Sequence, residues 1–136
     1  MCSSDLAVGA MRAALSAAGF SPEEIDYVNL HGTGTRANDA MEDRAVARIF
    51  GTAVPASSTK GWSGHTLGAS GALEAVIAAI CIDAGLIPGC LGVEAPDPGF
   101  ESRIATDNAA QRIDRVLSNS FGFGGSNCCL VIGRIP

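Results

Sequence analysis

The spacing of apolar positions along the chain switches between the period of a helix and that of a strand. Ala7–Ala18 carries apolar side chains three and four residues apart, at Val8, Met11 and Leu15, which predicts an amphipathic helix. The remaining expected elements, in chain order, are a strand at Ile25–Leu30, a helix from Asn38 or Asp39 to Phe50, a strand at Val54–Thr59, a helix at Thr66–Ala84, a long loop over residues 85–107, and strands at Ile113–Ser120 and Cys128–Ile135. Strands that alternate with helices and end in a strand pair predict an α/β layered fold with a mixed sheet.

The segment Thr66–Ala84 is apolar around its whole circumference, interrupted only by Glu74 and Asp83. A helix of this kind is expected to be buried on all sides. Its longest continuous apolar run, Ala75–Ile82, is far short of the roughly 20 residues that span a bilayer. We therefore expect no membrane segment.

Composition narrows the classes of function. With 136 residues, of which 47% are hydrophobic and 17% charged, the chain suits one compact domain with a sizeable core. The formal charge of −5 and the lack of any Lys/Arg run argue against nucleic acid or an anionic membrane as the main partner. The five cysteines are an odd number without a framework spacing, which favours reduced thiols in a cytoplasmic protein.

His31 and His65 are the only histidines, and each stands in a glycine-rich loop after an expected strand. Because rigid elements hold such loops toward a common point, the pair favours a functional site over two structural histidines. Zinc binding is the rival interpretation, but two histidines without a suitably spaced third ligand fit it poorly. His65 shortly precedes the expected helix, whose positive N-terminal field favours a neutral ring that can donate to a developing enolate.

Three further features are ambiguous from the residues alone. Lys60, the only lysine, either pairs with Glu74 inside the protein or is a solvated surface amine. The run Phe121–Asn127 lacks the G-x-G-x-x-G spacing and precedes a strand, so it is not a nucleotide-binding loop. It is either a glycine loop that presents N–H groups to an oxyanion or a hairpin turn. No cysteine neighbours a histidine in sequence, so no nucleophile is identified.

Three sequence blocks together resemble the β-ketoacyl-[acyl-carrier-protein] synthases of the KAS I/II type, in the thiolase superfamily. The blocks are Asn29–Thr35 followed by Asn38, Asp39 and Glu42, then Lys60–Gly71 with Glu74, and then Ser118–Asn127. The resemblance implies a thiolase-like α/β fold, of which this chain is the C-terminal half, with its very apolar helix central in the full-length enzyme. It also implies that residues 7–136 form the C-terminal synthase domain and that residues 1–6 are not family sequence.

The resemblance implies roles for individual residues. His31 and His65 would be the paired imidazoles that bind the malonyl thioester, promote its decarboxylation and stabilise the enolate. Lys60 would assist them as part of an ion pair with Glu74. The other implied roles are pantetheine binding by Thr33 and Thr35, support of the site by Asp39 and Glu42, and an oxyanion hole with a gate at Gly122, Phe123 and Gly124.

The implied reaction is a decarboxylative Claisen condensation of an acyl thioester with malonyl-carrier-protein, in fatty-acid, polyketide or aryl-polyene synthesis. It uses no metal and no cofactor beyond the pantetheine of the acyl carrier protein. Because the family's nucleophilic cysteine belongs to the preceding half of the fold, we expect this chain to be inactive alone and to expose an apolar helix face. The full-length enzyme is expected to be a homodimer. Two alternatives stay open, a non-catalytic partner of the chain-length-factor kind and a thiolase-type acyltransferase that does not decarboxylate.

Overall fold

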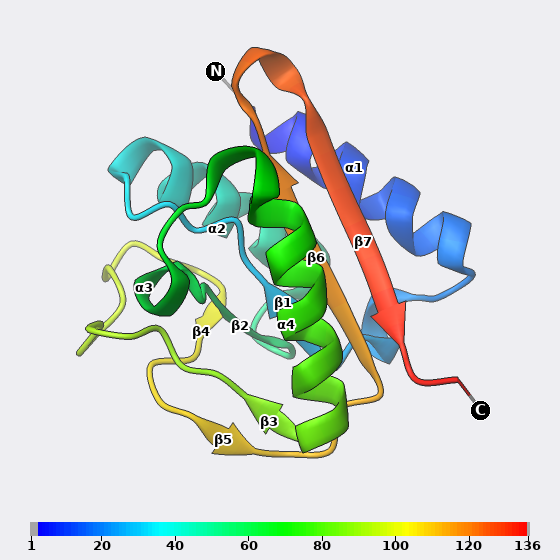
Figure 1. Ribbon diagram of the computed structural model, residues 1–136. Coiled ribbons are helices and arrows are strands. Elements are labelled where there is room, and N and C mark those ends of the chain that lie inside the picture. The colour runs from blue at the N-terminus through cyan, green and yellow to red at the C-terminus, as the bar shows by residue number, and fades with distance from the viewer. Residues whose placement is uncertain (1–2, 136) are drawn as a thin grey trace.

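A mixed sheet forms the centre of the molecule. The computed structural model describes residues 3–135, except for the side chain of Phe123. The strands are β1 (Tyr27–Asn29), β2 (Pro55–Ser57), β3 (Leu86–Ile87), β4 (Arg103–Ile104), β5 (Ala109–Ala110), β6 (Arg115–Phe121) and β7 (Asn127–Gly133). Five of them form one sheet in the order β4-β2-β1-β6-β7, in which only β7 is antiparallel to its neighbour (Figure 1). β3 and β5 pair separately. The predicted mixed α/β fold is confirmed.

Helices cover both faces of the large sheet. The helices are α1 (Ser4–Ala18), α2 (Arg36–Phe50), α3 (Lys60–Ser63) and α4 (Ser70–Ala84). α1 and α2 pack on one face, against Val28 and Leu117, and α4 packs on the other, against Tyr27 and Val116 (Figure 1). Neighbouring residues of a strand point to opposite faces, so β1 and β6 contribute to both cores.

Two helices begin earlier than the sequence predicts. α1 begins before Ala7, because the hydroxyl of Ser3 caps it by accepting the Leu6 N–H at 3.3 Å. α2 begins at Arg36, with Thr35 as its extended N-cap residue. The predicted start at Asn38 or Asp39 is therefore wrong, since Asn and Asp inside a first helical turn look like cap residues in sequence.

The segments on either side of α4 are also more structured than predicted. A 3₁₀ turn, Leu67–Ala69, precedes α4, so the α-helix itself begins at Ser70 rather than at Thr66. Ahead of it, Lys60–Ser63 forms the short helix α3. The loop predicted for residues 85–107 contains β3 and β4, which are too short for an alternating pattern to reveal them.

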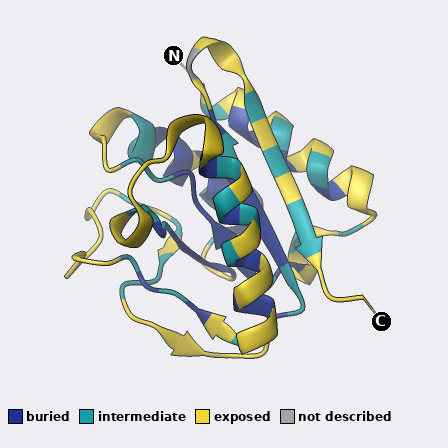
Figure 2. Cartoon of the chain, viewed as in Figure 1, coloured by how far each residue is buried: buried dark blue, intermediate teal, exposed yellow. Residues whose placement is uncertain are grey.

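α4 has one buried and one exposed face (Figure 2). Ala78 is fully buried, whereas Val76 and Ile80 are 56% and 59% exposed. The prediction of burial on all sides is thus wrong for this chain, and the expected exposed apolar face is present. The helical stretch Leu67–Ala84, with 18 residues and a mean hydropathy of 1.7, reaches the length and composition of a membrane span, as core helices of soluble proteins also do.

Candidate active site

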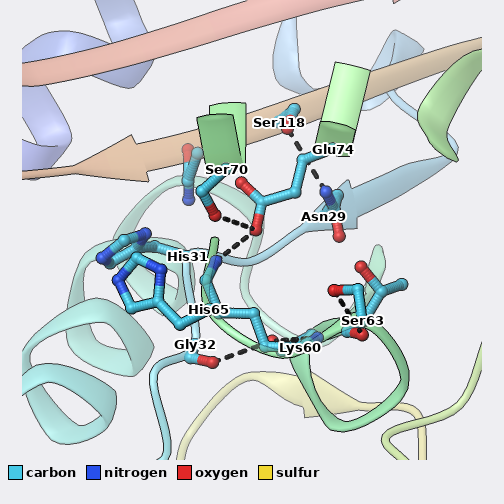
Figure 3. Close-up of polar contacts among 12 residues, drawn as sticks. Asn29, His31, Gly32, Lys60, Ser63, His65, Ser70, Glu74 and Ser118 are labelled. Atoms are coloured by element: carbon cyan, nitrogen blue, oxygen red, sulfur yellow. Dashed lines mark hydrogen bonds and ion pairs between the residues drawn. The ribbon is translucent and has the colours of Figure 1, made fainter. Parts of the chain in front are cut away.

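Two histidine-bearing segments meet at the carboxyl ends of the central parallel strands. His31 follows β1, His65 follows β2 and α3, and their ring centroids lie 5.5 Å apart at an interplanar angle of 86° (Figure 3). The ring of Phe121, at the end of β6, lies 5.9 Å from that of His31. Parallel strands deliver the residues that follow them to one edge of the sheet. The structure therefore brings together the two histidines that the sequence singles out.

A buried carboxylate holds the backbone of the first histidine. Glu42 in α2 is 2% exposed, and its two oxygens accept the N–H groups of His31 and Gly32, each at 2.8 Å. The amide of Asn119 in β6 donates to the same carboxylate at 3.1 Å. Burial raises the pKa of Glu42, while these three donors favour the ionised form. We assigned no role to Asn119 from the sequence, although a polar residue inside a buried strand is a signal for one.

The loop after β1 packs directly against the segment after β2. Gly32 has a φ of +38°, and a Cβ at this position would lie 2.4 Å from the Cβ of Ser58. The Ser58 hydroxyl donates to the Gly32 carbonyl oxygen at 2.8 Å. Only glycine permits this approach, which sets the distance between the two histidine-bearing segments.

His31 is neutral at physiological pH. Burial, then the charge of Lys60 and then His65 lower the pKa of His31 to about 4. The residue is 7% exposed, and its Nδ1 has no hydrogen-bond partner among residues 3–135. Because Nδ1 is buried, Nε2 is the nitrogen through which the neutral ring can contact a substrate atom.

His65 is exposed, and the backbone selects its tautomer. Its Nδ1 accepts the N–H of Leu67 at 3.2 Å. In the neutral ring the proton therefore sits on Nε2. The Nε2–H group is thus the hydrogen-bond donor that this ring offers.

The ion pair proposed between Lys60 and Glu74 is present and buried. Lys60 Nζ contacts Glu74 Oε1, and the two side chains are 7% and 2% exposed (Figure 3). The hydroxyl of Ser70 donates to the same oxygen at 3.4 Å. The alternative of a solvated surface amine is therefore wrong. The paired ammonium also contributes to the low pKa of His31, so the ion pair and the imidazoles act on one another.

A cavity of ≈ 750 Å³ adjoins the site and is lined by Lys60, His65 and Thr33. The hydroxyls of Thr33 and Thr35 lie 3.0 Å apart, and Asp39 also lines the cavity. A further wall comes from the segment that leads into β4. Its lining residues are Leu91, Val93, Ala95, Pro96, Asp97, Phe100 and Ile104.

The glycine loop is a hairpin connection between β6 and β7. The Gly122 N–H donates to the Ser126 carbonyl oxygen at 2.7 Å, and Gly124 has a φ of +82°. The Gly122 N–H is thus used within the turn. The side chain of Phe123 lies outside the described part of the chain, so its predicted gating role stays a prediction.

The other groups near the site are poorly suited to bind a metal or to act as a nucleophile. Within the described ranges, no three His, Cys, Asp or Glu side chains lie together as metal ligands, so the zinc interpretation has no third ligand. Cys90 lines the cavity, but burial raises the pKa of its thiol and its sulfur accepts the Ser58 N–H at 3.3 Å. Burial also raises the pKa of Cys81. Both thiols are protonated at neutral pH, which makes them weak nucleophiles.

Comparison with known proteins identifies the family. Residues 3–94 match the family described as "Beta-ketoacyl synthase, C-terminal domain". The chain belongs to the β-ketoacyl synthase family. This β-ketoacyl synthase chain is 44% identical over 129 residues to 3-oxoacyl-[acyl-carrier-protein] synthase 2 of Coxiella burnetii, an alignment that covers 92% of the chain and 31% of the relative.

Solved structures agree with this assignment. A β-ketoacyl synthase from Burkholderia phymatum matches with a TM-score of 0.94 and 36% identity, over 99% of this chain and 34% of that one. A ketosynthase from Xenorhabdus doucetiae, solved in complex with its chain length factor, matches with a TM-score of 0.89 and 41% identity, over 95% and 33% of the two chains. The predicted thiolase-like fold is confirmed, and the synthase chain spans about a third of the length of these relatives.

Proposed function

We propose that this chain supplies the malonyl-activating part of a 3-oxoacyl-[acyl-carrier-protein] synthase. The observation that carries the proposal is the pair of imidazoles of His31 and His65, whose ring centroids lie 5.5 Å apart. They come from separate strand ends beside a cavity that an extended thioester can enter. Two imidazole rings at this separation can both donate to one carbonyl oxygen, which is where negative charge develops in an enolate.

The proposed reaction begins when the malonyl thioester carbonyl accepts hydrogen bonds from the two rings. The bond between Cα and the carboxylate then breaks, CO₂ leaves, and its electron pair forms the enolate that both imidazoles stabilise. The Cα of the enolate attacks the carbonyl carbon of an acyl thioester and expels the thiolate that carried it, which yields a 3-oxoacyl thioester. Burial and the ammonium of Lys60, which Glu74 holds in place, keep His31 neutral for this step.

The acyl group is proposed to wait on a cysteine in the part of the relatives that this chain does not cover. Cys81 and Cys90 are unsuited, because burial raises the pKa of both thiols. On this proposal the 136 residues alone are inactive in condensation. The full-length enzyme would be a cytoplasmic homodimer that receives its substrates from an acyl carrier protein, with Thr33 and Thr35 on the pantetheine arm and the Phe123 N–H in the oxyanion hole.

The test joins this chain to the preceding two thirds of the Coxiella burnetii synthase and measures CO₂ release from malonyl-carrier-protein. We expect His31→Ala and His65→Ala each to lower release by at least about 10²-fold, the range of a lost transition-state donor. Gln111→Ala, an exposed position away from the cavity, is the control and should not change the rate.

The same assay separates the two alternatives. Condensation of acetyl units without CO₂ release would assign a thiolase-type reaction. Release of CO₂ that is insensitive to both histidine substitutions would overturn the proposal, and no release from the joined protein would favour the non-catalytic partner role.

A further inference from the structure

The helix that supports His31 also carries a second buried carboxylate, on the next residue. Asp43 is 4% exposed and plays no part in the proposed reaction. Its Oδ2 accepts the N–H of Glu101 at 2.9 Å, and its Oδ1 accepts the N–H of Ser102 at 3.0 Å. The Ser102 hydroxyl donates to Oδ1 as well. Asp43 therefore anchors a loop that lies far away in sequence.

The anchored loop forms part of the cavity beside the histidines. Phe100 and Ile104 flank the anchored residues and line the cavity, as does Asp97. Consecutive helical residues point about 100° apart, so Glu42 and Asp43 reach different loops from one turn of α2. One turn of a helix thus fixes two walls of the same cavity.

We propose that Asp43 is a positioning residue for substrate binding, which sets the width of the cavity by holding the loop that carries Phe100. The inference rests on the proposed function, since it takes the occupant to be the thioester arm that delivers the malonyl group to His31 and His65. That arm is a narrow chain of two amides joined by short apolar segments. A wall of Phe100, Ile104 and Leu91 suits it by close packing, which requires the wall to stay in place.

Replacing the Asp43 carboxylate by an amide should weaken its contacts to the loop, because the two groups differ in what they can accept. A carboxylate accepts at both oxygens, whereas an asparagine amide accepts at one oxygen and presents N–H groups at the other position. In Asp43→Asn the side-chain NH₂ group therefore faces one of the two backbone N–H groups, and that hydrogen bond is lost. We expect the loop at Glu101 and Ser102 to move away from α2, while the Glu42 contacts to His31 stay intact.

Asp26 provides a matched control. Its Oδ2 accepts the N–H groups of Asp114 and Arg115 at 2.8 and 2.9 Å, at the opposite ends of β1 and β6 from the histidines. Asp26→Asn therefore removes the charge of a similar backbone anchor without touching the cavity, while its amide oxygen can still accept both N–H groups.

The experiment titrates the ¹⁵N-labelled full chain with malonyl-pantetheine and measures Kd by NMR. Asp43→Asn should raise Kd about five- to tenfold and increase amide exchange at residues 101 and 102, with Asp26→Asn leaving Kd unchanged. Ser102→Ala removes only the hydroxyl donor and should give a smaller rise in Kd. This variant tests the proposal if Asp43→Asn does not fold. In the joined synthase, the proposal predicts a higher KM with kcat and the pH profile unchanged.

The outcomes separate this inference from the proposed function. Wild-type chain that does not bind malonyl-pantetheine would refute the proposed function, and the inference with it. Wild type that binds while both Asp43→Asn and Ser102→Ala bind equally well would overturn the positioning role alone. An equal loss of affinity in Asp26→Asn would also overturn it, because the effect would then come from removing a charge and not from the loop beside the cavity.

Discussion

The protonation of His31 offers the sharpest quantitative test of the site. Burial and the charge of Lys60 lower its pKa from the ordinary 6.5 to about 4. At pH 5.5 a group with this pKa is about 3% protonated, whereas an unperturbed histidine is about 90% protonated. Lowering the pH from 8 to 3 should therefore leave His31 neutral until well below pH 5.5.

The assay is a ¹H NMR titration of the two C2–H signals, because the chain contains only two histidines. His65→Gln assigns the signals by removing one of them. It should also raise the pKa of His31 slightly, since His65 is the smallest of the three causes that lower it. A His31 pKa at or above 6 in the wild type would refute the reasoning, because it would mean that the ring is solvated and distant from the Lys60 charge.

The lowered pKa of His31 also predicts how the free energy of unfolding changes with pH. The folded-state pKa of His31 lies below its unfolded value, so the folded protein binds fewer protons there. The stability from this group is complete above pH 6.5 and is lost as the pH falls toward 4. The slope for one proton is at most about 1.4 kcal/mol per pH unit. Urea unfolding of wild type and His31→Gln between pH 4 and 7 measures it, and parallel curves would contradict the assignment.

Two further predictions concern packing and the buried ion pair. Gly32→Ala combines a left-handed φ with a clash against Ser58, so it should lower the free energy of unfolding by about 3–5 kcal/mol. Gly34 has a positive φ in open space, so Gly34→Ala should lower it by only about 1–2 kcal/mol. Equal losses of stability in urea unfolding would exclude the clash. Lys60→Met leaves the Glu74 carboxylate buried and unpaired and should cost about 3–5 kcal/mol, and adding Glu74→Leu should recover most of it. A double variant no more stable than Lys60→Met would contradict this account.

The order of the elements and the identity of the two histidines could be predicted from local patterns. The spacing of apolar residues predicts helices α1 and α2 and strands β1, β6 and β7, because burial of one face or both produces a regular pattern of apolar positions. Glycine-rich loops after strands pointed to His31 and His65 for the same local reason. The short strands β3 and β4 left no such pattern, since a two-residue strand has no period.

Tertiary structure alone decided the properties that depend on neighbours through space. The low pKa of His31 comes from its burial and from Lys60, which is far away in sequence. The donors to Glu42 come from the loop after β1 and from β6, and those to Asp43 from the loop before β4, and no local pattern encodes such partners. Whether a face of α4 is buried or exposed likewise depends on what packs against it. An apolar sequence favours burial, but burial occurs only where another element packs against the helix.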